Sequence, residues 1–173
     1  YGGRISSVLN ITGKEANKEK FVGVAGIGLL TSKLNLEIPL WKERTSLLLS
    51  GRTTYSDWIM GLLPEKSGYK DGKAGFYDIG ATFSHTFNKY HKLNIYGYGN
   101  MNISAHWRAI FSEQFMANFS AGYDHYDYKN DESADSIQAA RLSFNIDQYF
   151  AKANFNLTLE KHKLNFGAST MMY

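Results

Sequence analysis

Apolar and polar residues alternate with a period of two along most of this 173-residue chain. The alternation is clearest in residues 101–111, where every odd position is apolar and polar side chains take the even positions up to Arg108. Residues 33–40, 78–87 and 115–124 repeat the pattern. A period of two is typical of a β-strand whose two faces meet different surroundings. The sequence therefore predicts an all-β, antiparallel chain with one apolar and one polar face.

The lengths and spacing of these segments narrow the architecture. Nine strands are expected, at residues 21–30, 32–40, 45–57, 76–87, 92–99, 100–111, 115–128, 137–160 and 163–173. Most reach the 9–11 or so residues that cross a bilayer on a tilt, whereas strands of soluble proteins average about 5–6 residues. No uninterrupted apolar run is long enough for a transmembrane helix.

The connections between the expected strands differ in length at the two ends. Four are short and charged, at residues 41–45, 88–92, 112–114 and 160–163. Two longer ones, 56–75 and 129–136, lie at the other end, and a single helical turn is expected within 56–63. Short turns at one end and longer loops at the other are typical of outer-membrane barrels.

Aromatic residues support this membrane interpretation. The chain has 12 Tyr and 11 Phe but only 2 Pro, and many of the aromatics fall near the expected strand ends, where barrels carry girdles at both interfaces. Composition alone fits a soluble β-sandwich or lipocalin-like barrel equally well. Strand length and the asymmetry of the loops favour the membrane.

Two local features carry specific predictions. In residues 141–160 the apolar positions change from even to odd near 149–151, and a β-bulge there would change the facing without ending the strand. At Tyr98–Asn100 two strands follow each other almost directly, which indicates either residues missing from a loop or a tight Gly-Asn turn.

The expected strand count points to a larger protein. Bacterial single-chain barrels have an even number of strands, and an open nine-stranded sheet in lipid would leave its edges unsatisfied. Either one segment is miscounted in a closed eight-stranded barrel, or further strands exist. A short strand in residues 1–12 and a polar linker in residues 13–20 favour the second option, because they suggest the end of a preceding domain.

Particular stretches resemble a known family. YGGRISSVLNITGKEAN (1–17), FVGVAGIGLLTSKLNLEIPL (21–40) and SLLLSGRTTY (46–55) are similar to the plug-to-barrel junction of TonB-dependent outer-membrane receptors of the Bacteroidetes type. FNIDQYFAKANFNLTLEKHKLNFGAS (144–169) resembles a later strand, periplasmic turn and next strand. Ile38 stands where the family usually has Gly, and Thr53 where a second Arg is common.

The resemblance implies an arrangement of domains and a function. Residues 1–19 would be the end of a plug domain and its linker, and residues 20–173 the first nine or so strands of a transmembrane barrel of about 22 strands. The implied function is receptor-mediated nutrient uptake across the Gram-negative outer membrane by TonB-coupled active transport. The implied partners are outer-membrane lipid, a TonB-type energy-coupling protein and a surface lipoprotein, with no nucleic acid.

The same resemblance points to a small set of contact residues. Trp58, Tyr69 and Tyr126 would contact a ligand or partner from the long-loop end. Arg4 and Arg52 would make polar contacts between plug and barrel, with Arg52 facing a plug carboxylate; the alternative for Arg52 is a solvated arginine in the lumen.

Other functions remain open on the residues alone. One is a receptor-like barrel that serves as a structural or docking subunit, and another is a small closed barrel of the adhesin type. The five His residues show no metal-ligand spacing, and no Ser lies in a G-x-S-x-G elbow. We therefore expect no enzyme activity, no metal and no cofactor.

Overall fold

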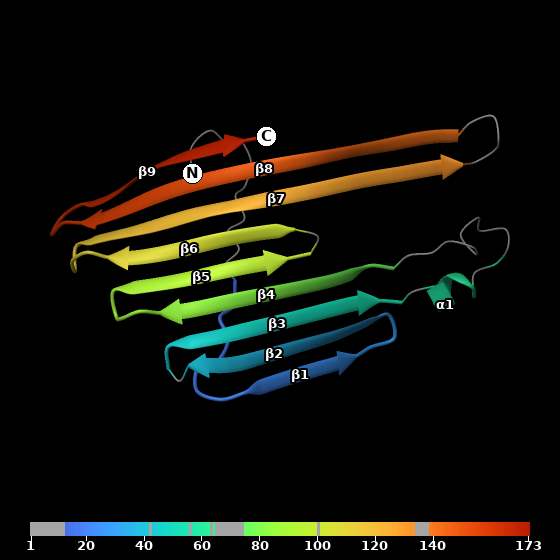
Figure 1. The fold of residues 1–173 in the computed structure, drawn as a ribbon, viewed down its shortest axis with the longest axis horizontal. Coiled ribbons are helices and arrows are strands. Elements are labelled where there is room, and N and C mark those ends of the chain that lie inside the picture. Colours follow the sequence, from blue (N-terminus) through green and yellow to red (C-terminus); the bar gives the residue numbers. More distant parts are fainter. Residues whose placement is uncertain are drawn as a thin grey trace.

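The computed structural model describes residues 13–41, 43–55, 57–62, 64, 75–99, 101–133 and 139–173. They form one antiparallel sheet in which each strand pairs with the next along the chain (Figure 1). The nine strands are β1 (Val22–Ile27), β2 (Thr31–Trp41), β3 (Thr45–Thr54), β4 (Tyr77–Thr86), β5 (His91–Tyr98), β6 (Asn102–Ile110), β7 (Phe115–Ser133), β8 (Ala139–Thr158) and β9 (Lys163–Met172). The expected number and order of strands are confirmed for the described part of the chain.

The sheet is open at both edges. Among the described strands, β1 pairs only with β2, and β9 pairs only with β8. Figure 1 shows β1 and β9 at opposite borders of the sheet. Each border strand therefore presents one row of backbone groups that no described strand satisfies.

Cross-strand registers give the sheet one apolar and one polar face, because residues directly opposite each other point to the same side. The side that we call the apolar face carries, among others, Leu36, Leu47, Phe83, Ile95, Trp107, Phe119, Phe155 and Phe166. The polar face carries, among others, Glu37, Ser46, Arg52, Asp78, Lys92, His106, Arg108, Asn118 and Asn154. The two-faced strands expected from the alternation are confirmed.

Little of the apolar face is covered within the described residues. Of the apolar side chains that the structure describes, only those of Ala16, Ala109 and Ala117 are buried. Large apolar side chains such as Ile79, Ile103 and Phe166 are more than half exposed. A sheet normally buries its apolar face against a second layer, so this face lacks its natural cover in the chain as described.

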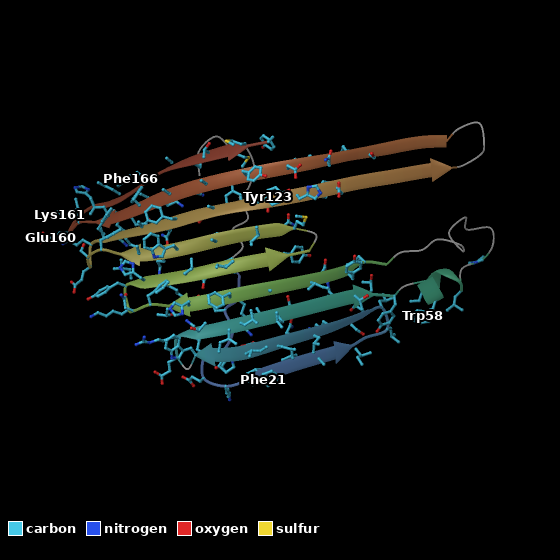
Figure 2. All side chains as sticks on the ribbon, viewed as in Figure 1. Phe21, Trp58, Tyr123, Glu160, Lys161 and Phe166 are labelled. Atoms are coloured by element: carbon cyan, nitrogen blue, oxygen red, sulfur yellow. The ribbon has the colours of Figure 1, made fainter. Side chains whose placement is uncertain are left out.

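The four short connections lie together at one edge of the sheet, as expected. They follow β2, β4, β6 and β8, and Figure 2 places Glu160 and Lys161 at this edge and Trp58 at the opposite one. At that opposite edge the β3–β4 connection is long, and it contains α1 (Asp57–Met60), the single turn that the sequence predicts. Among the described residues there is no helix with the length and apolar character to cross a bilayer.

Two local predictions were wrong. The β7–β8 register runs without a shift from Phe115 to Ser133, so no β-bulge occurs at 149–151. Successive side chains of β8 go on alternating regularly between the two faces. The apolar residues therefore lie on one face before residues 149–151 and on the other face after them. Residues 129–133, expected in a loop, belong to β7 because they pair with residues 139–143 of β8.

The β5–β6 connection is tight. Tyr98 pairs directly with Asn102, and Gly99 adopts a positive φ of 55° that glycine tolerates without a steric penalty. Met101 also has a positive φ, 96°, and its amide donates to the carbonyl of Gly99 at 3.1 Å. This geometry fits the tight-turn alternative. The prediction of residues missing from this loop is untested.

Candidate functional site

The linker of residues 13–20 lies against the polar face of the sheet. Figure 1 shows this blue segment crossing the strands before it enters β1. Ser46 on β3 donates its hydroxyl to the carbonyl of Ala16 at 3.1 Å, and Ala16 is 5% exposed. The backbone of Gly13 lies so close to Tyr96 on β5 that an added Cβ would come within 2.5 Å of the ring. The first half of the linker thus crosses the polar face from β5 to β3.

Glu37 on β2 anchors one side of the linker. Its carboxylate accepts hydrogen bonds from the Lys14 ammonium and, at 2.8 Å, from the backbone amide of Asn17. The Glu37 side chain is almost buried beneath this contact. A carboxylate that receives both a charged and a backbone donor makes a stronger contact than a neutral hydrogen bond.

Glu15 anchors the other side of the linker, on β5. Its carboxylate accepts a hydrogen bond from Lys92 and lies 3.7 Å from the ammonium of Lys18. Lys18 in turn donates to the hydroxyl of Thr86 at 2.8 Å. Burial alone would raise the pKa of the Glu15 carboxyl, but the hydrogen bond and charge of Lys92, together with Lys18, hold it below its ordinary value.

Beyond the linker, the polar face is hollowed between β5 and β8. This hollow has a volume of about 660 Å³. It is lined by, among others, Glu15, Lys92, Asn94, His106, Arg108, Asn118, Ser120, Lys152 and Asn154. His106 and Ser120 share a hydrogen bond of 2.9 Å across β6 and β7. We call this the basic hollow, because Lys92, Arg108 and Lys152 outnumber its one carboxylate, Glu15.

Arg52 lies on the polar face, as the alternation predicts, near the long-loop end. Its guanidinium donates two hydrogen bonds to one oxygen of Asp78 on β4, at 2.9 Å and 2.5 Å. The other oxygen of Asp78 accepts the hydroxyl of Tyr98 at 2.7 Å. The carboxylate that Arg52 contacts therefore belongs to the sheet, and the expected contact with a plug carboxylate stays a prediction.

Trp58 lies at the long-loop end, on α1. Its indole N–H donates to the carbonyl of Leu29 at 3.1 Å, in the turn between β1 and β2. The hydroxyl of Tyr55 donates to the carbonyl of Gly28 at 2.5 Å in the same turn. Trp58 is 49% exposed, so its ring is fixed in position and accessible.

Tyr126 lies far from Trp58 across the sheet, on the part of β7 that extends beyond β6. It faces the polar side opposite Ile146, is 55% exposed, and its ring centroid lies 6.1 Å from that of Phe144. Tyr126 and Asp78 line one hollow of about 420 Å³ above the β5–β6 turn. Arg4 and Tyr69 lie outside the described residues.

The extension of β7 and β8 reverses the character of the two faces. The apolar face, which carries Phe119 and Phe155 in the earlier part of these two strands' pairing, becomes polar in the extension. There His125 hydrogen-bonds Asp147 at 2.6 Å and Asp127 at 3.1 Å. The change from apolar to polar side chains on this face occurs next to the pair Tyr123 and Tyr149, whose ring centroids are 4.8 Å apart. Hydrogen bonds from the His125 ring to the carboxylates of Asp147 and Asp127 raise the pKa of His125 above its ordinary value.

Sequence reasoning missed the linker contacts and the basic hollow. The lysine and glutamate residues of GKEANKEK (13–20) indicate that the linker can form ion pairs. The sequence does not show which residues they contact, because those residues lie 20 or more positions away. Within the described residues, no group of acidic or histidine side chains is arranged to hold a metal ion. No family model matches the chain, and neither a curated protein nor a solved structure shows significant similarity to it.

Proposed function

We propose that this chain forms part of the wall of a TonB-dependent outer-membrane receptor, which takes up a nutrient by active transport. The observation that carries the proposal is the linker, which is held on the polar face by Glu15 and Glu37 while the opposite face stays apolar and uncovered. A sheet with lipid on one side and a chain segment on the other is the arrangement of a plugged barrel.

Lipid is the cover that best fits the apolar face. On β7 the apolar residues run from Phe115 to Tyr123, nine residues, which is the length of strand that crosses a bilayer on a tilt. Aromatic rings mark both limits, with Phe111 and Phe115 stacked 5.4 Å apart at one and Tyr123 beside Tyr149 at the other. Beyond Tyr149 the same side carries His125 and Asp147, as expected where a strand leaves the lipid.

The unpaired borders and the linker favour a large barrel over a small one. In lipid, the free edges of β1 and β9 need further strands, because their backbone groups have no water to bond. An eight-stranded barrel is filled by its own side chains. A segment of chain lying on the inner wall needs a wider lumen, in line with the barrel of about 22 strands that the family resemblance implies.

The family resemblance supplies the step from barrel to transport. In such a receptor, residues 1–19 end the plug and residues 20–173 begin the barrel. The ion pairs of Glu15 and Glu37 would then hold the plug's exit segment to the wall. The protein would reside in the Gram-negative outer membrane and work with a TonB-type energy-coupling protein.

Binding of the coupling protein tests this function without knowledge of the nutrient. The full-length native chain, purified in detergent micelles, is mixed with the periplasmic domain of the TonB-type protein from the same bacterium. We expect saturable binding that is lost when the coupling segment at the receptor's N-terminus is deleted. Absence of binding, or a native polypeptide close to the 19.6 kDa of this chain, would contradict the proposal.

A further inference from the structure

Two positive side chains face each other directly across β5 and β6. The register places Lys92 opposite Arg108 on the polar face, and both line the basic hollow. Like charges directly opposite each other in a sheet are destabilising. A pair of this kind is tolerated when negative charge lies close to both members.

The carboxylate in the hollow does not balance this charge. Glu15 is already engaged by Lys92 and Lys18. Among the described residues, Arg108 has no ion-pair partner, and Lys152 adds a further positive charge to the lining. Counted as formal charges, Lys92, Arg108, Lys152 and Glu15 give the lining a total of +2.

Elsewhere on the polar face, some of the positive side chains have acidic partners. Glu37 pairs with Lys14, and Asp78 pairs with Arg52. Lys33 nevertheless lies directly opposite Arg52, so the β5–β8 region differs from the rest of the face by its hollow and not by its charge alone.

The neutral groups around the cations also suit an anion. Amide side chains of Asn94, Asn118 and Asn154 and the hydroxyl of Ser120 line the same hollow, and each can donate a hydrogen bond. A guanidinium such as that of Arg108 can hold a carboxylate or phosphate with two parallel hydrogen bonds. The volume of about 660 Å³ lies within the range of small-molecule sites.

We propose that the basic hollow binds a small solute that carries two or more carboxylate or phosphate groups. Arg108 provides the bidentate contact, and Lys92 and Lys152 provide further positive charge. The identification of this solute as cargo rests on the proposed function. The site itself does not, because it is defined by the side chains of β5 to β8.

Calorimetric titration of the full-length protein in neutral detergent tests the site. The probes are inorganic phosphate and citrate, first at low ionic strength and then at raised NaCl concentration. We expect at least one probe to bind and its affinity to fall with salt, because the contact is electrostatic. We expect Arg108→Gln to weaken binding about tenfold or more, as the loss of a bidentate charged contact does.

The matched control is Arg44→Gln, which removes an arginine from the β2–β3 turn, outside the hollow. Wild-type protein that binds neither probe overturns the inference, as does an Arg44→Gln variant that loses as much affinity as Arg108→Gln. The coupling-protein assay separates the two proposals. Coupling without anion binding contradicts the site alone, and anion binding without coupling contradicts the transport function alone.

Discussion

Glu15, in the segment before the first strand, accepts a hydrogen bond from Lys92 on β5, although 77 residues separate the two in sequence. This contact holds the linker of residues 13–20 on the polar face of the sheet. It also places a charged pair in the lining of the basic hollow, because Glu15 and Lys92 both line it. The docking of the linker is therefore the feature that connects the fold to its proposed use.

Neutralising Glu15 should loosen the linker. In a Glu15→Gln variant we expect the linker contact to weaken by roughly 1 kcal/mol, because a charged hydrogen bond at a partly exposed site is replaced by a neutral one. Hydrogen exchange of the amides of residues 16–18 measures this as lost protection. The control is Glu19→Gln, since Glu19 is an exposed acid of the same linker whose carboxylate makes no contact in the described structure. Equal loss of protection in both variants would contradict the assigned contact.

The linker contact should also depend on acidity. The folded-state pKa of Glu15 is depressed, with burial opposing the shift and Lys92 and Lys18 causing it. Its contribution is therefore fully present above the pKa of the unfolded chain and is lost as the pH falls through the lower folded value. We expect linker protection to survive mild acidification and to disappear below the ordinary glutamate range. NMR of the Glu15 carboxyl carbon measures the midpoint of its titration. A midpoint at or above the ordinary glutamate pKa would show that Lys92 does not pair with Glu15.

The strand segments and their two faces could be predicted from the sequence, because period-two alternation is a local property. The sequence prediction of a bulge in β8 was wrong. Apolar residues that move from even to odd positions within one strand have two possible causes: a β-bulge, or a change in the surroundings of each face along the strand. The unbroken pairing of Tyr123 with Tyr149 and of His125 with Asp147 shows the second cause.

The end of β7 and the linker contacts could not be predicted for a related reason. Lys129–Ser133 is rich in residues that disfavour strands, and it is a strand because it pairs with residues 139–143. The partners of Glu15 and Glu37 are likewise set by the register of distant strands. Local pattern carries no information about such pairs.

The cluster on the β7–β8 extension should titrate with His125. The folded-state pKa of His125 is raised by the hydrogen bonds that its ring donates to Asp147 and Asp127. The contribution of His125 to stability is therefore fully present below the unfolded pKa and is lost as the pH rises through the folded value. NMR titration of the His125 ring should give a midpoint above that of an ordinary histidine. In Asp147→Asn the midpoint should fall, whereas Asp124→Asn, on the opposite side of β7, should leave it unchanged. A His125 midpoint unaffected by Asp147→Asn contradicts the contact.

A charge should be tolerated on one face of β3 and not on the other. Leu47 and Leu48 are consecutive, with Leu47 on the apolar face opposite Ile38 and Leu48 on the polar face opposite Glu37. In a lipid bilayer we expect Leu47→Arg to be destabilising, by up to the roughly 2–4 kcal/mol found for arginine at the bilayer midplane. Leu48→Arg should cost less, because its guanidinium can reach the Glu37 carboxylate. Reversible unfolding in urea from liposomes measures both, and equal costs would contradict the assignment of the faces.

The central claim is that the apolar face meets lipid and the polar face does not. These 173 residues contain no cysteine. Once any cysteine elsewhere in the full-length protein has been replaced, a single spin label can be attached at Ala105 or at Ser104, neighbours on opposite faces of β6. The measurement is the accessibility of each label to oxygen, which dissolves in lipid, and to a water-soluble nickel complex, in the full-length protein reconstituted in liposomes. The account predicts that the Ala105→Cys label meets oxygen and is shielded from nickel, while the Ser104→Cys label shows the lower oxygen accessibility. Free access of nickel to the Ala105→Cys label, or oxygen accessibility there no higher than at Ser104→Cys, would show that the apolar face does not lie in the membrane.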